Sequence, residues 1–135
     1  MRASAELRLQ ISRRADRRCE YCRLHEDDAA FPHEVDHIIS RQHGGGDELD
    51  NLAWSCMLCN RSKGTNLSSV DSSGAVVRLF DPRADHWHSH FRLEGAVIQP
   101  ITGHGTATAT LLRMNAAERV MERNLLQGLG RYPRI

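Results

Sequence analysis

Long apolar runs, aromatic side chains and lysines are all scarce in this chain of 135 residues. No apolar stretch approaches the roughly 18 residues of a membrane-spanning helix, and the N-terminal segment lacks the apolar stretch of a signal peptide. We therefore expect a cytoplasmic protein without a membrane partner. The length excludes a large modular enzyme and predicts a single domain over residues 1–135.

The net charge argues against nucleic-acid binding, but the charge distribution does not. The formal net charge is +1 and only 5% of the residues are aromatic, which is a poor bulk composition for a nucleic-acid-binding domain. Residues 1–24, however, hold seven arginines against three acids, whereas residues 25–50 hold one arginine against eight acids. The acidic block is either ordinary surface patterning or a set of carboxylates that could bind a cation.

The four cysteines form two C-x-x-C pairs, with none left over. Four thiolates suit a tetrahedral structural zinc ion, and two pairs from distant segments can tie a small domain together. Disulfides or a redox pair are the alternatives, but a reducing cytosol disfavours disulfides and a redox motif explains only one pair. We therefore predict a zinc site at Cys19, Cys22, Cys56 and Cys59.

The segment between the two cysteine pairs carries the most informative pattern. Residues 34–40 predict a short strand, on which Asp36 and His37 stand side by side. Adjacent residues on a strand point to opposite faces, so one of the two can bind a metal while the other addresses a water molecule. A glycine-rich turn and a second apolar segment at 49–55 follow, and residues 60–64 have a spacing compatible with a helix.

Several motifs follow one another in a recognisable order: Cys-x-x-Cys, Val-Asp-His-Ile, Gly-Gly with Asn-Leu, and Cys-x-x-Cys-Asn-x-x-Lys-Gly. This combination resembles the HNH endonuclease family in its bacterial, zinc-knuckle form, and the resemblance covers residues 19–64. It implies an α+β fold with a ββα-metal core, also called a His-Me finger. In that core a strand, a loop, a second strand and a helix enclose one catalytic divalent cation.

The resemblance also implies roles for individual residues. Asp36 would bind the catalytic cation together with Asn60, and His37 would be the general base that takes a proton from the attacking water. Asn51 would brace the loop and orient His37. Because the protein would supply so few oxygen ligands, water and phosphate would complete an octahedral shell, which suits Mg²⁺ or Mn²⁺.

Three further side chains are candidates for contact with DNA, most simply double-stranded DNA. Lys63, the only lysine, occupies a motif position and shares the expected helix with Arg61, so both could contact phosphates; a solvated helix face is the alternative. His43 lies in the loop that faces the proposed site and could bind phosphate or metal, or simply be solvated. Three alternating histidines could form a second metal site but are better explained by packing around Trp87: His86, His88 and His90.

The N-terminal flank predicts a helix over about residues 4–17, because Leu7, Ile11 and Ala15 recur at four-residue steps. Its arginines fall mostly on other faces of that helix. They could lie along a DNA backbone or form a solvated basic surface: Arg8, Arg13, Arg14 and Arg17.

The C-terminal extension, about residues 70–127, is expected to surround the core. Residues 76–80 and 91–98 predict strands of a small sheet, whereas residues 102–113 leave helix and strand equally open. Residues 115–118 have the form of a capping box, which predicts a C-terminal helix that ends near residue 127.

Three functions from different classes fit these patterns. A metal-dependent nuclease that cuts DNA is favoured, because Asp36, His37, Asn51 and Asn60 are all present. A zinc-stabilised nucleic-acid-binding domain without cleavage activity is the main alternative. A zinc-scaffolded interaction or redox module is disfavoured, since both cysteine pairs are intact and no cysteine is left over.

Overall fold

The residues between the cysteine pairs form a β-hairpin followed by a helix in the computed structural model, which describes residues 3–134. Strand β1 (Glu34–His37) pairs antiparallel with β2 (Leu52–Ser55), so that Asp36 lies opposite Ala53. Helix α2 (Met57–Lys63) begins directly after β2. This ββα order confirms the predicted α+β fold class.

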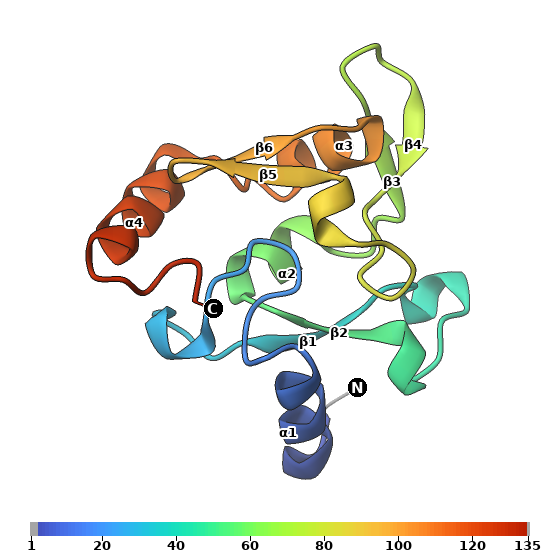
Figure 1. The fold of residues 1–135 in the computed structure, drawn as a ribbon. Coiled ribbons are helices and arrows are strands. Elements are labelled where there is room, and N and C mark those ends of the chain that lie inside the picture. The colour runs from blue at the N-terminus through green and yellow to red at the C-terminus, as the bar shows by residue number, and fades with distance from the viewer. Residues whose placement is uncertain (1–2, 135) are drawn as a thin grey trace.

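Helices α1 (Ala5–Arg14) and α2 cover opposite faces of the hairpin (Figure 1). Ile11 of α1 is fully buried against Leu52 and Trp54. The helix ends at Arg14, three residues before the predicted end, because the two residues after Ala15 adopt left-handed backbone angles that no helix continues through.

Two of the helix arginines attach α1 to the hairpin instead of lying free on its surface. Arg8 donates to the backbone carbonyl of His33 at 2.6 Å and stacks on the Trp54 ring at 5.1 Å. Arg14 donates to the carbonyls of Leu49 and Leu52. These contacts give Arg8 and Arg14 a structural role in joining α1 to the hairpin.

Two further hairpins follow α2, each forming its own two-stranded sheet. Strands β3 (Ser68–Val70) and β4 (Val76–Arg78) make the hairpin that projects from the molecule, and β5 (Phe91–Glu94) pairs with β6 (Val97–Pro100) (Figure 1). The predicted segments at 76–80 and 91–98 therefore do not share one sheet. Strand β4 pairs with β3, which precedes it in the chain, and the segment at 91–98 contains β5 and part of its partner β6.

Helices α3 (Gly103–Leu111) and α4 (Ala117–Gly128) complete the C-terminal extension. The segment at 102–113, ambiguous in the sequence, is helical because the Thr102 hydroxyl caps its first turn. The predicted capping box is wrong: the Asn115 side chain bonds both backbone groups of Ile98 instead, and α4 begins after Ala116 without a side-chain cap. Among residues 3–134, no helix is long and apolar enough to cross a membrane.

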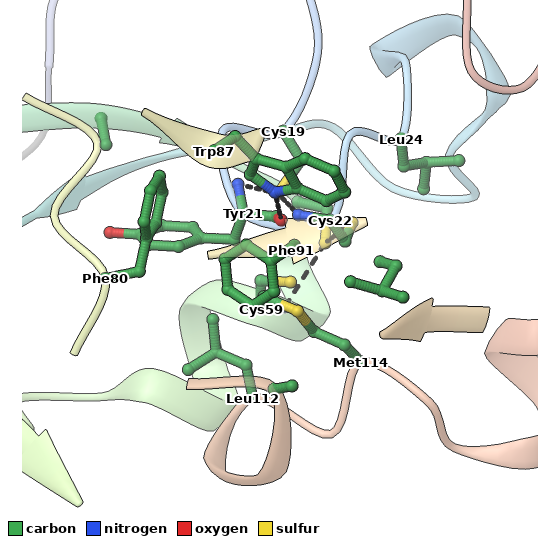
Figure 2. Packing of buried hydrophobic residues seen from close by; sticks show 14 residues of the cluster. Cys19, Tyr21, Cys22, Leu24, Cys59, Phe80, Trp87, Phe91, Leu112 and Met114 are labelled. Carbon is green, nitrogen blue, oxygen red and sulfur yellow. Dashed lines mark hydrogen bonds between the residues drawn. The ribbon is translucent and has the colours of Figure 1, made fainter. Parts of the chain in front are cut away.

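The C-terminal extension supplies much of the core that surrounds the cysteines (Figure 2). Trp87 and Phe91 stack close together, with ring centroids 5.1 Å apart, and the Trp87 indole N–H donates to the carbonyl of Tyr21 at 2.7 Å. Leu112 and Met114 are fully buried in the same cluster. Residues 80–114 therefore pack directly on the first cysteine pair, which fits the predicted role of the extension as support.

Candidate active site and metal-binding site

The four cysteines come together in one buried cluster. Cys19 and Cys22 sit on the loop after α1, whereas Cys56 caps α2 and Cys59 lies one turn into it. The four sulfur atoms lie within 4.8 Å of one another, and this is the only such group of possible ligands among the described residues. The alternating histidines at 86–90 form no such group, and Trp87 among them is buried, as the packing explanation requires.

The spacing of the cysteine sulfurs matches a shared metal ion and does not match disulfides. The Sγ atoms of Cys22 and Cys56 are 3.7 Å apart, and all four cysteines are free. A disulfide would need about 2.05 Å, whereas four sulfurs at about 2.3 Å from a tetrahedral zinc ion lie about 3.8 Å from one another. Backbone N–H groups of Cys22 and Cys59 also donate to sulfurs at 3.4 Å. The residues present thus fit a structural zinc ion.

Arg119 of α4 places a positive charge directly against these sulfurs. Its guanidinium donates to Cys59 Sγ at 3.0 Å and also bonds the carbonyl of Leu112 at 2.8 Å. Burial by itself would lower the pKa of Arg119, but the sulfurs of Cys59 and Cys22 outweigh burial and raise it. A zinc ion with four thiolates would carry two net negative charges, and Arg119, 60 residues after Cys59 in the chain, would compensate part of that charge.

Asp36 points from β1 into the protein, towards α2 and the first cysteine pair. One carboxylate oxygen accepts from the Lys63 ammonium at 3.2 Å, and the other accepts from the Tyr21 hydroxyl. Only 2% of Asp36 is exposed. Burial raises the pKa of the Asp36 carboxyl, and the contacts from Lys63 and Tyr21 oppose that rise. Burial also raises the pKa of Tyr21, so its hydroxyl stays a donor to Asp36.

His37, the next residue, faces a different part of the molecule. Its Nε2 atom lies 2.8 Å from Oδ1 of Asp47, in the loop between β1 and β2. Oδ2 of Asp47 accepts from Arg41 at 2.6 Å. The hydrogen bond from His37 and the charge of Arg41 lower the pKa of Asp47, which is therefore ionised at neutral pH. Asp36 and His37 thus contact separate sets of groups, as alternation along a strand requires.

Asn51 ties the loop between β1 and β2 into a closed turn. Its side-chain amide donates to the carbonyls of Ile39 and Gly46 at 2.9 and 2.8 Å, and its Oδ1 accepts from Ile39 N–H at 2.9 Å. Gly45 passes so close to this turn that a Cβ there would lie 1.7 Å from the Ile39 carbonyl oxygen. The loop that carries Asp47 is therefore held next to the end of β1.

Asn60 lies on α2 and contacts Glu34, two residues before Asp36 on the same face of β1. Asn60 Nδ2 donates to Glu34 Oε1 at 2.9 Å, which leaves the Asn60 carbonyl oxygen as the atom able to bind a cation. Both residues line an open cleft of about 1050 Å³ between α1 and α2, together with the exposed Arg61. Asp36 and His37 do not line this cleft.

The remaining candidates for DNA contact differ sharply in accessibility. Lys63 is 2% exposed, and its ammonium bonds Asp36 and the carbonyl of His37 at 3.0 Å, so it is not presented to a phosphate on the surface. Arg61 has 70% of its side chain exposed, and His43 is exposed in the loop. Accessible phosphate contacts can thus come from Arg61 and His43 without rearrangement.

Comparison with known proteins finds one family that part of the chain matches. Residues 19–66 match the HNH endonuclease family. The matched segment spans both cysteine pairs, β1, β2 and α2, which is about a third of the chain. No curated protein and no solved structure matches the chain.

Residues 19–66 form what we call the HNH segment. Two acidic residues of this segment contact candidate site residues but were not singled out by the sequence: Glu34 and Asp47. Glu34 could have been found from strand alternation, because residues 34 and 36 share a face of β1. Asp47 had no such signal, since its position depends on how the loop folds back on His37. Outside the HNH segment, Arg119 reaches the cysteines only through the packing of α4.

Proposed function

We propose that this protein is a metal-dependent endonuclease that hydrolyses phosphodiester bonds of double-stranded DNA, with residues 1–135 acting as one domain. The observation that carries the proposal is the match of residues 19–66 to the HNH endonucleases, in a segment folded as ββα. The four cysteines hold a structural zinc ion, whose donor set and spacing they fit.

His37 acts as the general base. Its Nε2 atom is engaged by Asp47, and Nδ1 has no hydrogen-bond partner among the described residues, so Nδ1 is the nitrogen that can accept a proton from a water molecule. Histidine commonly serves as a general base in this way. Asn51 positions the loop around His37 through its three hydrogen bonds.

Asp36 and Asn60 would hold a catalytic Mg²⁺ or Mn²⁺ after a rearrangement, because Asn60 lines the open cleft whereas Asp36 is buried and does not. Their carboxylate and amide oxygens are the hard ligands that these cations prefer. When bound, the cation would stabilise the negative charge that develops on the scissile phosphate and the leaving oxygen. Asp36 can take this role only by exchanging the Lys63 ammonium for the cation, because two cations beside one carboxylate repel each other.

Contacts with the DNA backbone come from Arg61 and His43, which are both exposed. Lys63 would join them if it left Asp36 on cation binding. We expect modest sequence preference, because the sequence contains no recognisable base-reading module. The protein works in the cytoplasm.

A zinc-stabilised DNA-binding domain without cleavage is the second candidate, and the buried Asp36–Lys63 pair is the observation that favours it.

A plasmid assay separates the two candidates. Purified protein is incubated with supercoiled plasmid and Mg²⁺ or Mn²⁺, and nicked and linear products are quantified. We expect cleavage with at least one cation, and a loss of about 100-fold or more in His37→Ala, the scale of general-base catalysis. His86→Ala removes an exposed histidine outside the HNH segment and serves as the matched control. Intact plasmid with every cation, together with retained binding in a mobility-shift assay, would establish the non-cleaving domain.

A further inference from the structure

We propose that Asp47 is the positioning residue of His37: its carboxylate holds the imidazole proton on Nε2 and thereby keeps Nδ1 free to accept a proton. This inference rests on the proposed nuclease function, in which Nδ1 of His37 is the basic atom. It concerns a residue of the loop between β1 and β2 that no sequence motif singled out.

The contact itself decides where the imidazole proton lies. Nε2 of His37 is 2.8 Å from Oδ1 of Asp47, well within hydrogen-bonding distance. An ionised carboxylate can only accept hydrogen bonds, so Nε2 must carry the proton that joins the two groups. In the neutral imidazole, the lone pair is then on Nδ1, which is the arrangement a base needs on that side of the ring.

The surroundings of Asp47 leave it little freedom to adopt another arrangement. Its second oxygen, Oδ2, accepts from Arg41 at 2.6 Å, and the loop on either side is closed by Asn51. Gly45 lies so close to Ile39 that no larger residue fits this turn as it stands. Arg41, Asp47 and His37 therefore form one chain of hydrogen bonds that ends at Nε2 of the imidazole and leaves Nδ1 as the basic nitrogen.

A stabilising surface ion pair is the alternative explanation for Asp47. The side chains of Asp47 and Arg41 are 42% and 55% exposed, and pairs of that kind contribute little to stability. A purely structural role would give a small loss of stability when Asp47 is removed. It would leave the position of the His37 proton unchanged.

Arg41 makes Asp47→Asn a sharper test than Asp47→Ala. A guanidinium only donates, so it holds the carbonyl oxygen of the new amide and turns the amide N–H₂ towards His37. That N–H₂ would donate to Nε2 and drive the imidazole proton onto Nδ1, which blocks the base. Asp47→Ala only removes the restraint. We therefore expect Asp47→Asn to be the more damaging substitution, and Arg41→Ala to relieve part of its effect.

Nitrogen NMR of histidine-labelled protein measures this directly, independently of cleavage. At about pH 8, where an ordinary imidazole is neutral, long-range ¹H–¹⁵N spectra distinguish the protonated ring nitrogen from the bare one. The His37 signals are assigned from their loss in His37→Ala. We expect protonated Nε2 in the wild type and protonated Nδ1 in Asp47→Asn. Asp50→Asn removes an exposed charge in the same loop and should leave the spectrum unchanged.

Plasmid cleavage supplies the second readout. We expect kcat to fall about 10-fold in Asp47→Ala and about 100-fold in Asp47→Asn, with KM for the plasmid nearly constant. The proposal is overturned if wild-type His37 carries its proton on Nδ1, or if Asp47→Asn leaves the proton on Nε2. If the wild type cuts no DNA but the spectra behave as expected, the positioning contact stands and the nuclease function alone fails.

Discussion

The cysteine cluster and the His37 loop lie in the same HNH segment but are built in opposite ways. The cysteines are between 0 and 3% exposed, and residues from three separate parts of the chain cover them. The His37 loop is held mainly by hydrogen bonds of Asn51, and the Asp47 side chain is 42% exposed. The first region is therefore part of the buried core, whereas water can reach the side chains of the second.

An arginine contacts each of the two regions, but the two interactions differ in strength. Arg119 approaches buried sulfurs and is 8% exposed, so its charge acts with little screening by water. Arg41 bonds Asp47 at the surface, where solvent and salt weaken the interaction. The same residue type thus stabilises the fold in one region and orients a side chain in the other. Substitutions in the two regions should therefore separate stability from activity.

The largest effect on stability is expected from Cys56→Ala. A structural zinc site contributes about 10–16 kcal/mol in small domains, which is comparable to the whole stability of a domain, about 5–15 kcal/mol. We expect Cys56→Ala to lose both bound zinc and cooperative unfolding, measured by zinc quantification and circular dichroism. Leu58→Ala, at a half-exposed position on the same helix, is the control. A folded Cys56→Ala protein without zinc would show that the cluster is dispensable.

Arg119→Met should have the next largest effect. Removing one member of a buried charge pair typically costs about 3 kcal/mol or more, because the partner charge is left without compensation. The expected result is a lower midpoint in urea unfolding and faster release of zinc to a colorimetric chelator. Arg92→Met changes an exposed arginine on β5 and should shift the midpoint little. Equal midpoints for the two variants would mean that α4 does not stabilise the cysteine cluster.

Gly45→Ala should affect the loop more than the fold. The added Cβ would collide with the Ile39 carbonyl, and relief of such overpacking typically costs about 2 kcal/mol. We expect a modest decrease in melting temperature and a large loss of plasmid cleavage, since the turn that carries Asp47 must move. Gly128→Ala, where a Cβ meets nothing within 4 Å, is the matched control. Unchanged cleavage would show that the geometry of this turn does not affect catalysis.

His37→Ala should have the smallest effect on stability. The side chain is 16% exposed but makes only one hydrogen bond, to a half-exposed carboxylate, so its loss should lower the free energy of unfolding by about 1 kcal/mol. Thermal unfolding followed by fluorescence measures this, and bound zinc should be unchanged. If His37→Ala instead lost zinc and unfolded like Cys56→Ala, the division between a structural and a chemical region would be wrong.

Local patterns predicted the elements of the HNH segment well. The cysteine spacing predicted the cluster, and the segments predicted at 34–40, 49–55 and 60–64 overlap β1, β2 and α2. Their ββα arrangement was implied by the family resemblance. One prediction was wrong because a side chain has another hydrogen-bond partner in the folded protein. Asn115 was expected to cap α4, but it bonds Ile98, because a hydrogen bond to the edge of β6 satisfies its amide within the fold.

The sequence by itself determined which chemistry is present: four thiolates in two pairs, and Asp36 beside His37 on a strand. Residue type and alternation decide such features locally. Only the tertiary structure decided what each group contacts. It paired Asp36 with Lys63, placed Asp47 on His37 and brought Arg119 to the cysteines. These contacts join residues 10 to 60 positions apart, and their formation depends on chain packing that no local pattern encodes.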